Sequence, residues 1–284
     1  MIAIFPHKWE LLWMECTLQA TKLPAGRQRL VAVVRAAGDV IKVGDVVTTL
    51  SVGRSDAAKL LSRWTRQGWL RRVGPGAYAP APLDSLGSEH VLTDPWVLVP
   101  ALYSPGYIGG WTAAQHWDLT EQLFRETLVM TAQPVREKRQ TRHGAAFVLR
   151  HVPETKIFGT RSIWRGRSKV PISDVHRTIV DMLDDPGLGG GIQHVADCLN
   201  AYLKRPDRDD SKLIEYAERI KNGAVFKRLG FLAVRHSSAS QLVEACQSRL
   251  TKGNSKLDPS LKCPRLISKW RLWVPDTWEA GAVA

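Results

Sequence analysis

The chain has 284 residues, of which 44% are hydrophobic and 24% are charged. This composition excludes a disordered or collagen-like chain and leaves room for two folded domains. The formal net charge is +13, and residues 1–85, 86–150 and 151–284 carry 12, 6 and 22 Lys/Arg against 6, 6 and 15 Asp/Glu. A basic surface attracts nucleic acid, an acidic protein or an anionic membrane, so charge favours nucleic acid without deciding the matter.

The cysteines are widely spaced and form no CxxC pair, so neither a disulfide framework nor a zinc site is expected. They are Cys16, Cys198, Cys246 and Cys263. Scattered thiols suit the reducing cytoplasm. No stretch approaches the ~20 consecutive apolar residues that span a bilayer. The sequence therefore predicts a cytoplasmic protein without metal, cofactor or membrane segment.

Residues 1–23 form an apolar leader of uncertain role. They lack the basic start and the A-x-A-type cleavage site of a secretory signal. A start nearer Met14 explains this leader at least as well as a targeting role does.

Residues 24–82 are predicted to form a winged helix-turn-helix DNA-binding domain, because three helices and a basic hairpin follow one another closely. The expected elements are a helix over Pro24–Ala37, a short strand over Val40–Lys42, a helix over Val43–Leu50, a helix from Ser55 to Gly68 and a hairpin over Trp69–Pro80. Ser55 is expected to be the N-cap of the third helix, and Gly68 is expected to end it.

The third helix has two opposed faces when its residues are placed 100° apart. Its apolar side carries Ala57, Leu60, Leu61 and Trp64. Lys59, Arg63 and Arg66 lie on the other side. In a helix-turn-helix the last helix enters the major groove, so this face and the basic hairpin predict a DNA-contacting surface. A winged helix used for protein contacts and a merely solvated charged face are the alternatives.

Residues 83–93 are a predicted linker, and residues 94–284 a mixed α/β domain with strands first and helices later. The whole chain is thus expected to be α+β. The expected strands are Thr127–Thr131, Ala146–Val152, Lys156–Phe158, Ser162–Trp164, Lys169–Ile172 and a closing strand over Lys269–Val274. The expected helices are Trp96–Leu102, one capped by Ser173, Ile192–Leu203, Ser211–Ile220, Ala224–Leu232 and Ser237–Leu250.

Three stretches resemble the AbiEi family of antitoxins from type IV toxin–antitoxin and phage-abortive-infection operons. They are LLSRWTRQGWLRRVGPGAYAPAP, YIGGWTAAQHWDLTEQ and VPISDVHRTIVDMLDDPGLGGGIQHVADCL. AVFKRLGFLA and the late LDPSL and KWRLWV add to the likeness, which runs from about Pro24 to Val274. No single piece is diagnostic, and their order and spacing carry the resemblance.

The resemblance implies an N-terminal domain that binds operator DNA with paired half-sites and represses its own operon. It implies a C-terminal domain required for antitoxicity, and an AbiEii-like nucleotidyltransferase toxin as the partner. The family supplies no catalytic residues. Carried onto this sequence, Lys59, Arg63 and Arg66 would read DNA from the helix and Arg71 and Arg72 from the wing. Arg54 and Ser55 would contact phosphate at the helix start.

A metal-dependent nuclease is the rival hypothesis. Glu154 and Lys156 follow a predicted strand, and an acid-x-Lys at that place is half of one nuclease motif. The second acid would be Asp118 or Glu121, neither of which stands in the usual Pro-Asp context. Exposed acids and lysines after a strand are more often loop residues.

Other chemistry-bearing groups have simpler structural explanations. Ser173 and His176 could suggest a nucleophile and a base, although Ser173 is better explained as a helix cap. Asp181, Asp184 and Asp185 could suggest a metal but are expected to be solvated. Trp270, Trp273 and Trp278 are candidates for a partner-facing patch.

Overall fold

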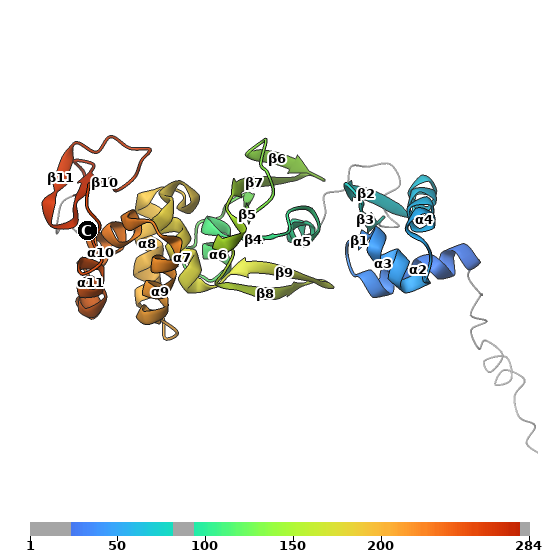
Figure 1. The fold of residues 1–284 in the computed structure, drawn as a ribbon, viewed down its shortest axis with the longest axis horizontal. Helices are drawn as coiled ribbons and strands as arrows, with labels where there is room; N and C mark the ends of the chain where they lie inside the picture. Colours follow the sequence, from blue (N-terminus) through green and yellow to red (C-terminus); the bar gives the residue numbers. More distant parts are fainter. Residues whose placement is uncertain (1–23, 82–93, 279–284) are drawn as a thin grey trace, which may run out of the picture.

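The computed structural model describes residues 24–81 and 94–278 (Figure 1). It shows a winged helix-turn-helix at one end and a mixed α/β domain beyond it, as the predicted α+β fold class requires. The leader 1–23 and the predicted linker 83–93 lie outside the described residues, so the structure does not bear on them.

The winged helix-turn-helix has the predicted order of elements. They are α2 (Ala25–Ala37), β1 (Ile41–Lys42), α3 (Val43–Leu50), α4 (Arg54–Arg66), β2 (Leu70–Gly74) and β3 (Ala77–Pro80). The three strands form an antiparallel sheet in the order β1-β3-β2. Their small core is apolar and is built from Val33, Ile41, Val46, Ala57, Leu61, Trp64 and Leu70.

The predicted N-cap of α4 is wrong. Helix α4 begins one residue earlier, at Arg54, and its N-cap is Gly53 with extended backbone angles. Ser55 therefore lies inside the first turn, where its side chain makes no cap hydrogen bond.

A six-stranded mixed sheet forms the centre of the second domain, in the order β6-β7-β5-β4-β9-β8. Its strands are β4 (Gly106–Ile108), β5 (Glu126–Thr131), β6 (Arg139–Arg142), β7 (Ala145–His151), β8 (Thr160–Arg165) and β9 (Ser168–Ser173). The pairs β5–β7 and β4–β9 are parallel and the others antiparallel. The strand expected over Lys156–Phe158 is wrong, because Glu154–Lys156 forms a 3-10 turn instead.

Each face of the sheet is covered by different elements. One face buries Ile108, Val129, Phe147 and Ile172 against the turn η1 (Pro95–Leu98) and α5 (Val99–Leu102). The other buries Tyr107, Leu128 and Met130 beside Trp111 of α6 (Gly110–His116). The central strands β4 and β5 are thus buried on both sides.

Helices and a small sheet complete the chain (Figure 1). They are α7 (Val175–Asp184), η3 (Pro186–Gly189), α8 (Ile192–Leu203), α9 (Asp210–Ile220), α10 (Gly223–Ala233), η4 (Ser237–Ala239), α11 (Ser240–Gln247), β10 (Ser255–Lys256), β11 (Arg265–Ile267), η5 (Ser268–Trp270) and β12 (Leu272–Val274). The expected helices over residues 192–203, 211–220 and 224–232 are confirmed to within a residue. Among the described helices, none has the length and apolar character needed to cross a bilayer.

Two sequence-based expectations fail in this region. Ser173 ends β9, and the N-cap of α7 is Asp174, whose carboxylate accepts the backbone N–H of Arg177. Trp270 and Trp278 are buried in the helical core and so do not form a partner-facing patch.

The two hairpins of the sheet hold the winged helix-turn-helix. At the β8–β9 turn, the backbone N–H of Arg167 and the hydroxyl of Ser168 donate to Asp39 Oδ2 at 2.8 and 3.0 Å. At the β6–β7 turn, His143 Nε2 lies 3.2 Å from the carbonyl oxygen of Val73 in β2. Val73, Ala77 and Ala79 also share the apolar cluster of the sheet. The orientation of the winged helix-turn-helix is therefore set by contacts with the second domain.

Candidate nucleic-acid interface

The outer face of α4 is a continuous polar and cationic surface. Ala57, Leu61 and Trp64 are buried, whereas Lys59, Arg63 and Arg66 are exposed on the opposite side. The exposed side chains line an open depression together with Ser55, Ala58 and Ser62. The structure thus brings together the helix residues that the sequence singled out.

The charge on this face is available to an anionic partner. Lys59 Nζ lies 3.2 Å from Asp56 Oδ1, but both side chains are largely exposed, and such surface pairs contribute little. Arg63 and Arg66 lie in the last turn of α4, where cations complement the helix dipole. Arg54 and Ser55 are exposed in the first turn, where backbone N–H groups point outward.

The two wing arginines differ in their surroundings. Arg72 is exposed and donates from Nε to the carbonyl oxygen of Gly74 at 3.2 Å. Arg71 is half-buried and pairs with Ala79, which packs against the second domain. Directly paired residues lie on the same face of a sheet. Arg71 therefore lies on the face of the wing that packs against the second domain, which we call the docked face, and Arg72 lies on the opposite face.

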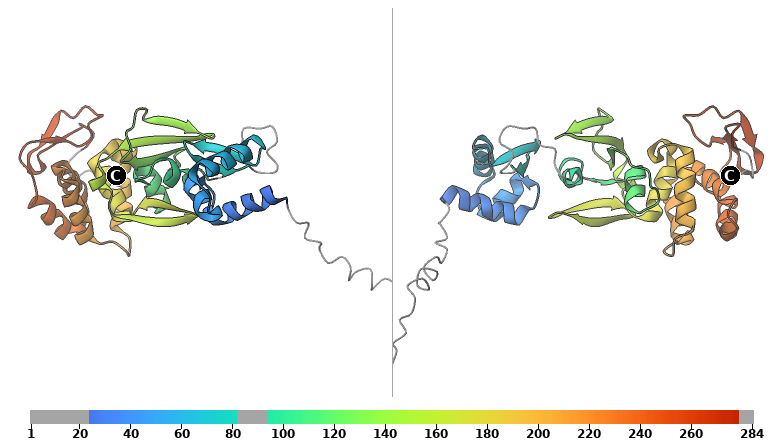
Figure 2. Two further views of the ribbon diagram at one scale, coloured as in Figure 1. Left: turned by 45° about the vertical axis from the view of Figure 1, so that its right-hand side comes forward. Right: turned by 180° about the vertical axis from the view of Figure 1, so that it is seen from behind.

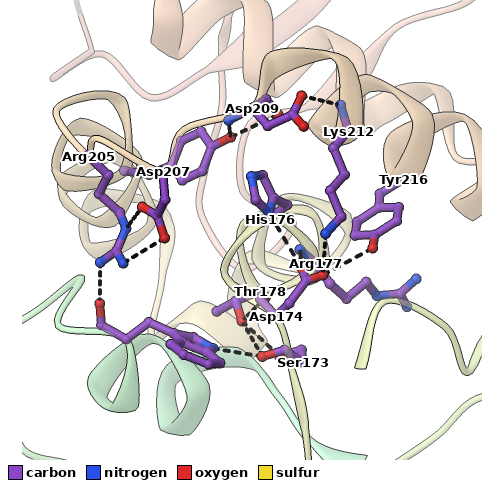
Figure 3. Close-up of polar contacts among 12 residues, drawn as sticks. Ser173, Asp174, His176, Arg177, Thr178, Arg205, Asp207, Asp209, Lys212 and Tyr216 are labelled. Atoms are coloured by element: carbon purple, nitrogen blue, oxygen red, sulfur yellow. Dashed lines mark hydrogen bonds and ion pairs between the residues drawn. The ribbon is translucent and has the colours of Figure 1, made fainter. Parts of the chain in front are cut away.

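A second polar cluster surrounds Asp174 at the start of α7, but it is buried and structural (Figure 3). Lys212 Nζ and the Tyr216 hydroxyl each lie 3.0 Å from Asp174 Oδ2. His176 Nδ1 lies 3.7 Å from Asp174 Oδ1. Burial acts to raise the pKa of Asp174, but the contacts with His176, the Arg177 N–H and Lys212 outweigh it and hold that pKa below its usual range.

Ser173 and His176 do not form a nucleophile–base pair. The Ser173 hydroxyl is buried and shares a hydrogen bond of 2.8 Å with Thr178 Oγ1. Both ring nitrogens of His176 are buried without a hydrogen-bond partner, so His176 does not activate Ser173. The cluster stabilises the junction of β9, α7 and α9.

The nuclease hypothesis gains no support from the described residues. Glu154 lies in an exposed 3-10 turn, and Asp118 is exposed after α6. Across residues 24–81 and 94–278, no three His, Cys, Asp or Glu side chains gather in a way that could hold a metal ion. The expectation that Asp181 is solvated is wrong, because this carboxylate is buried beneath Tyr107 and Arg177.

Residues 28–81 match the model of a protein family described as a transcriptional regulator, AbiEi antitoxin. The resemblance to the AbiEi family is confirmed in this segment. All of the candidate DNA contacts of this AbiEi-type domain lie inside the match: Arg54, Ser55, Lys59, Arg63, Arg66, Arg71 and Arg72. The match supports a role as a transcriptional regulator or antitoxin.

The fold of nearly the whole chain is similar to the crystal structure of the RV2827C protein from Mycobacterium tuberculosis. The TM-score is 0.57 at 14% sequence identity, over 88% of this chain and 92% of the other. At that identity the likeness concerns the fold alone. No curated protein matches the sequence.

Sequence reasoning missed the edge strand β6 and the docking of the AbiEi-type domain on the sheet. A signal for β6 was present, since His143-Gly144 is a two-residue hairpin turn with φ angles of 51° and 75°. The contact between Asp39 and Arg167 could not be predicted from local sequence, because the two residues are 128 positions apart.

Proposed function

We propose that this protein is a sequence-specific operator-binding repressor of its own operon. The observation that carries the proposal is the exposed cationic face of α4, formed by Lys59, Arg63 and Arg66, in a domain that matches a transcriptional regulator family. Binding would combine neutralisation of backbone phosphates with a few contacts to base edges in the major groove. Operator binding would place the protein in the cytoplasm.

Different residues of the α4 and wing surface would contact bases and phosphates. Arg63 is suited to reading a guanine, since a guanidinium can donate two hydrogen bonds to its major-groove edge. Arg54 and Ser55 at the start of α4 and Arg72 on the wing would hold phosphates and set the register. The operator is expected to contain paired half-sites, filled by one dimer or by two cooperating monomers.

We further propose that the protein is the antitoxin of a type IV toxin–antitoxin system that acts in phage defence. Its partner would be an AbiEii-like nucleotidyltransferase toxin, opposed through direct binding, through its product or through repression. The family description supports the antitoxin role. In this role the protein is a binding protein and not an enzyme.

A salt-titrated gel shift on the DNA upstream of the protein's own operon tests the repressor role, with a scrambled duplex of the same length alongside. Binding to the native duplex alone at physiological salt is the expected result. Equal, salt-sensitive binding to both duplexes would contradict the proposal and favour a protein-binding adaptor instead.

Antitoxicity is tested separately by expressing the neighbouring gene from an independent promoter. Growth arrest that is relieved by the wild-type protein supports the antitoxin role. The independent promoter removes any contribution of operator binding to rescue. A K59Q/R63Q/R66Q variant that still rescues growth would therefore show that neutralisation is separate from repression. Absence of toxicity would contradict the antitoxin proposal, and toxicity without rescue would leave repression as the only way in which the protein opposes the toxin.

A further inference from the structure

An open cavity lies between the wing of the AbiEi-type domain and the central sheet. Its volume is about 340 Å³, and its walls come from the turn of the wing, the end of α5 and the strands β6 and β7. Both views of Figure 2 show the β6–β7 hairpin next to β2. Small-molecule sites have volumes of about 300–1,000 Å³ and often lie between domains. The cavity therefore has the size and the location of a ligand site.

The walls of the cavity are largely apolar and are held in place by packing. Val73 of β2, Leu102 of α5 and Leu149 of β7 contribute aliphatic side chains, and all three belong to the apolar cluster of the sheet. A Cβ atom at Gly74 would collide with Leu102, so the turn of the wing packs directly on the end of α5. Such walls suit the apolar body of a small organic molecule.

One buried polar group at the cavity lacks a partner. Tyr103 lines the cavity and is only 6% exposed, and its hydroxyl forms no hydrogen bond of ordinary geometry among the described residues. The residue is firmly held, because its ring packs on Phe147 at a centroid distance of 5.5 Å and its carbonyl oxygen accepts a hydrogen bond of 2.8 Å from Thr131 Oγ1. Buried polar groups without a partner are rare in proteins, and a bound ligand would satisfy this hydroxyl.

A cation lies near the Tyr103 hydroxyl. Arg142 of β6 lines the cavity and is exposed, and its Nη2 donates to Gln140 Oε1 at 3.1 Å. Burial raises the pKa of Tyr103 and the positive charge of Arg142 opposes this rise, so the two groups are close enough to act on one ligand. Among the described residues that line the cavity, none is acidic. A guanidinium and a hydroxyl that both donate hydrogen bonds can hold a carboxylate between them.

We propose that this cavity binds a small organic carboxylate with an apolar body. Arg142 and the Tyr103 hydroxyl hold the carboxylate, and the aliphatic side chains of Val73, Leu102 and Leu149 contact the rest of the molecule. Since the walls come from both domains, the bound molecule joins the wing to the sheet and stabilises their contact. This site goes beyond the proposed operator binding and does not depend on it.

A titration of the full chain with 2-naphthoate tests the proposal, followed by NMR through the backbone amides of Val73, Leu102 and Leu149. The compound carries a carboxylate on a flat apolar ring system. Two further probes separate its parts, since 2-naphthamide has the rings without the charge and inorganic phosphate has the charge without the rings. R142Q removes the cation of the cavity. R139Q is the matched control, because Arg139 lies on the same strand, has a 75% exposed side chain and is not among the residues that line the cavity.

Naphthoate is expected to bind the wild type at one site with a Kd of about 0.1–1 mM, as is typical of a ligand of this size. R142Q should raise this Kd about tenfold or more, and Y103F should raise it roughly three- to tenfold. R139Q should leave it unchanged. Naphthamide and phosphate should each bind the wild type about tenfold more weakly than naphthoate does.

Two kinds of result would overturn the proposal. One is the absence of saturable shifts at these amides, or a Kd for naphthoate that is the same in R142Q as in the wild type. The other is binding of phosphate or naphthamide as tight as that of naphthoate, which would show a simple anion contact or a non-specific apolar contact. The titration contains no DNA, so its outcome is independent of the proposed function.

Discussion

The Tyr107 hydroxyl donates a hydrogen bond of 3.0 Å to Asp181 Oδ2, and both side chains are buried. Arg177 Nε donates to Asp181 Oδ1 at 2.9 Å, and its Nη2 donates to the Tyr107 oxygen at 3.0 Å. Burial raises the pKa of Asp181 to about 6, although the neighbouring Arg177 opposes the rise. These hydrogen bonds join β4 to α7, so the YIGGW and VHRTIVD stretches stabilise the fold through contacts with each other.

Replacing Tyr107 by Phe tests this structural role. The variant removes one hydroxyl from a closed network and leaves Asp181 and Arg177 each short of a partner. We expect the free energy of unfolding to fall by about 1–3 kcal/mol in urea denaturation, because a buried polar group without a partner is costly. Operator affinity of the folded variant should be unchanged. An undiminished unfolding free energy would show that the network contributes nothing to stability.

Replacing Asp174 by Asn changes how stability depends on pH. The pKa of Asp174 is held below its usual range in the folded protein. A carboxylate of this kind stabilises the fold above its unfolded pKa of about 4, and the contribution is lost as the pH falls through the folded value. We expect D174N to lower the unfolding free energy at pH 7 on the order of 3 kcal/mol and to flatten its decrease below about pH 4.

The matched control for that experiment is Asp207→Asn. Asp207 is paired with Arg205 at 2.7 Å, but its side chain is 55% exposed. Such a pair is expected to contribute less than about 1 kcal/mol. An equal effect of D174N and D207N would argue against a special role for the buried carboxylate.

Replacing Arg63 by Gln tests the reading of bases by α4. If Arg63 donates to a guanine, the loss of operator affinity should be about 1–3 kcal/mol, with relaxed preference at one base pair. Competition binding against operators mutated at each position measures both quantities. Lys252→Gln controls for the change in net charge. Uniform weakening on every sequence would instead assign Arg63 to a phosphate.

Substitutions of the two wing arginines are expected to affect DNA binding differently in the same experiment. Arg72 is exposed, so R72Q is expected to weaken binding to all sequences and to lower the salt slope by about 1. Arg71 is half-buried on the docked face, so R71Q should have the smaller effect on the salt slope. The reverse order would mean that the wing turns a different face to DNA.

Local patterns in the sequence were sufficient for most of the elements. Helix α3 has the predicted bounds, and the buried and exposed faces of α4 follow from its periodicity. The N-cap errors are each a matter of one or two residues: α4 begins at Arg54, one residue before Ser55, so its N-cap is Gly53. At α7 the Ser173 hydroxyl is used by Thr178, and Asp174 takes the cap.

The remaining failures depend on partners distant in the sequence. Asp181 appeared to belong to an acidic helix end, and only Tyr107 and Arg177 explain why it is buried. Trp270 packs against Gly230, where there is no room for a Cβ atom, and this contact is invisible before the fold is known. Strand β6 is polar throughout and has no apolar period, so only the His143-Gly144 turn that follows it distinguishes it from a loop.

The most direct test of the account is the salt dependence of operator affinity for the K59Q/R63Q/R66Q variant, measured by fluorescence anisotropy beside the wild type. The account predicts that the slope of log K against log salt falls by about 3 and that the preference for operator over scrambled DNA is lost. A variant that keeps the wild-type preference for its operator would contradict the assignment of DNA reading to α4.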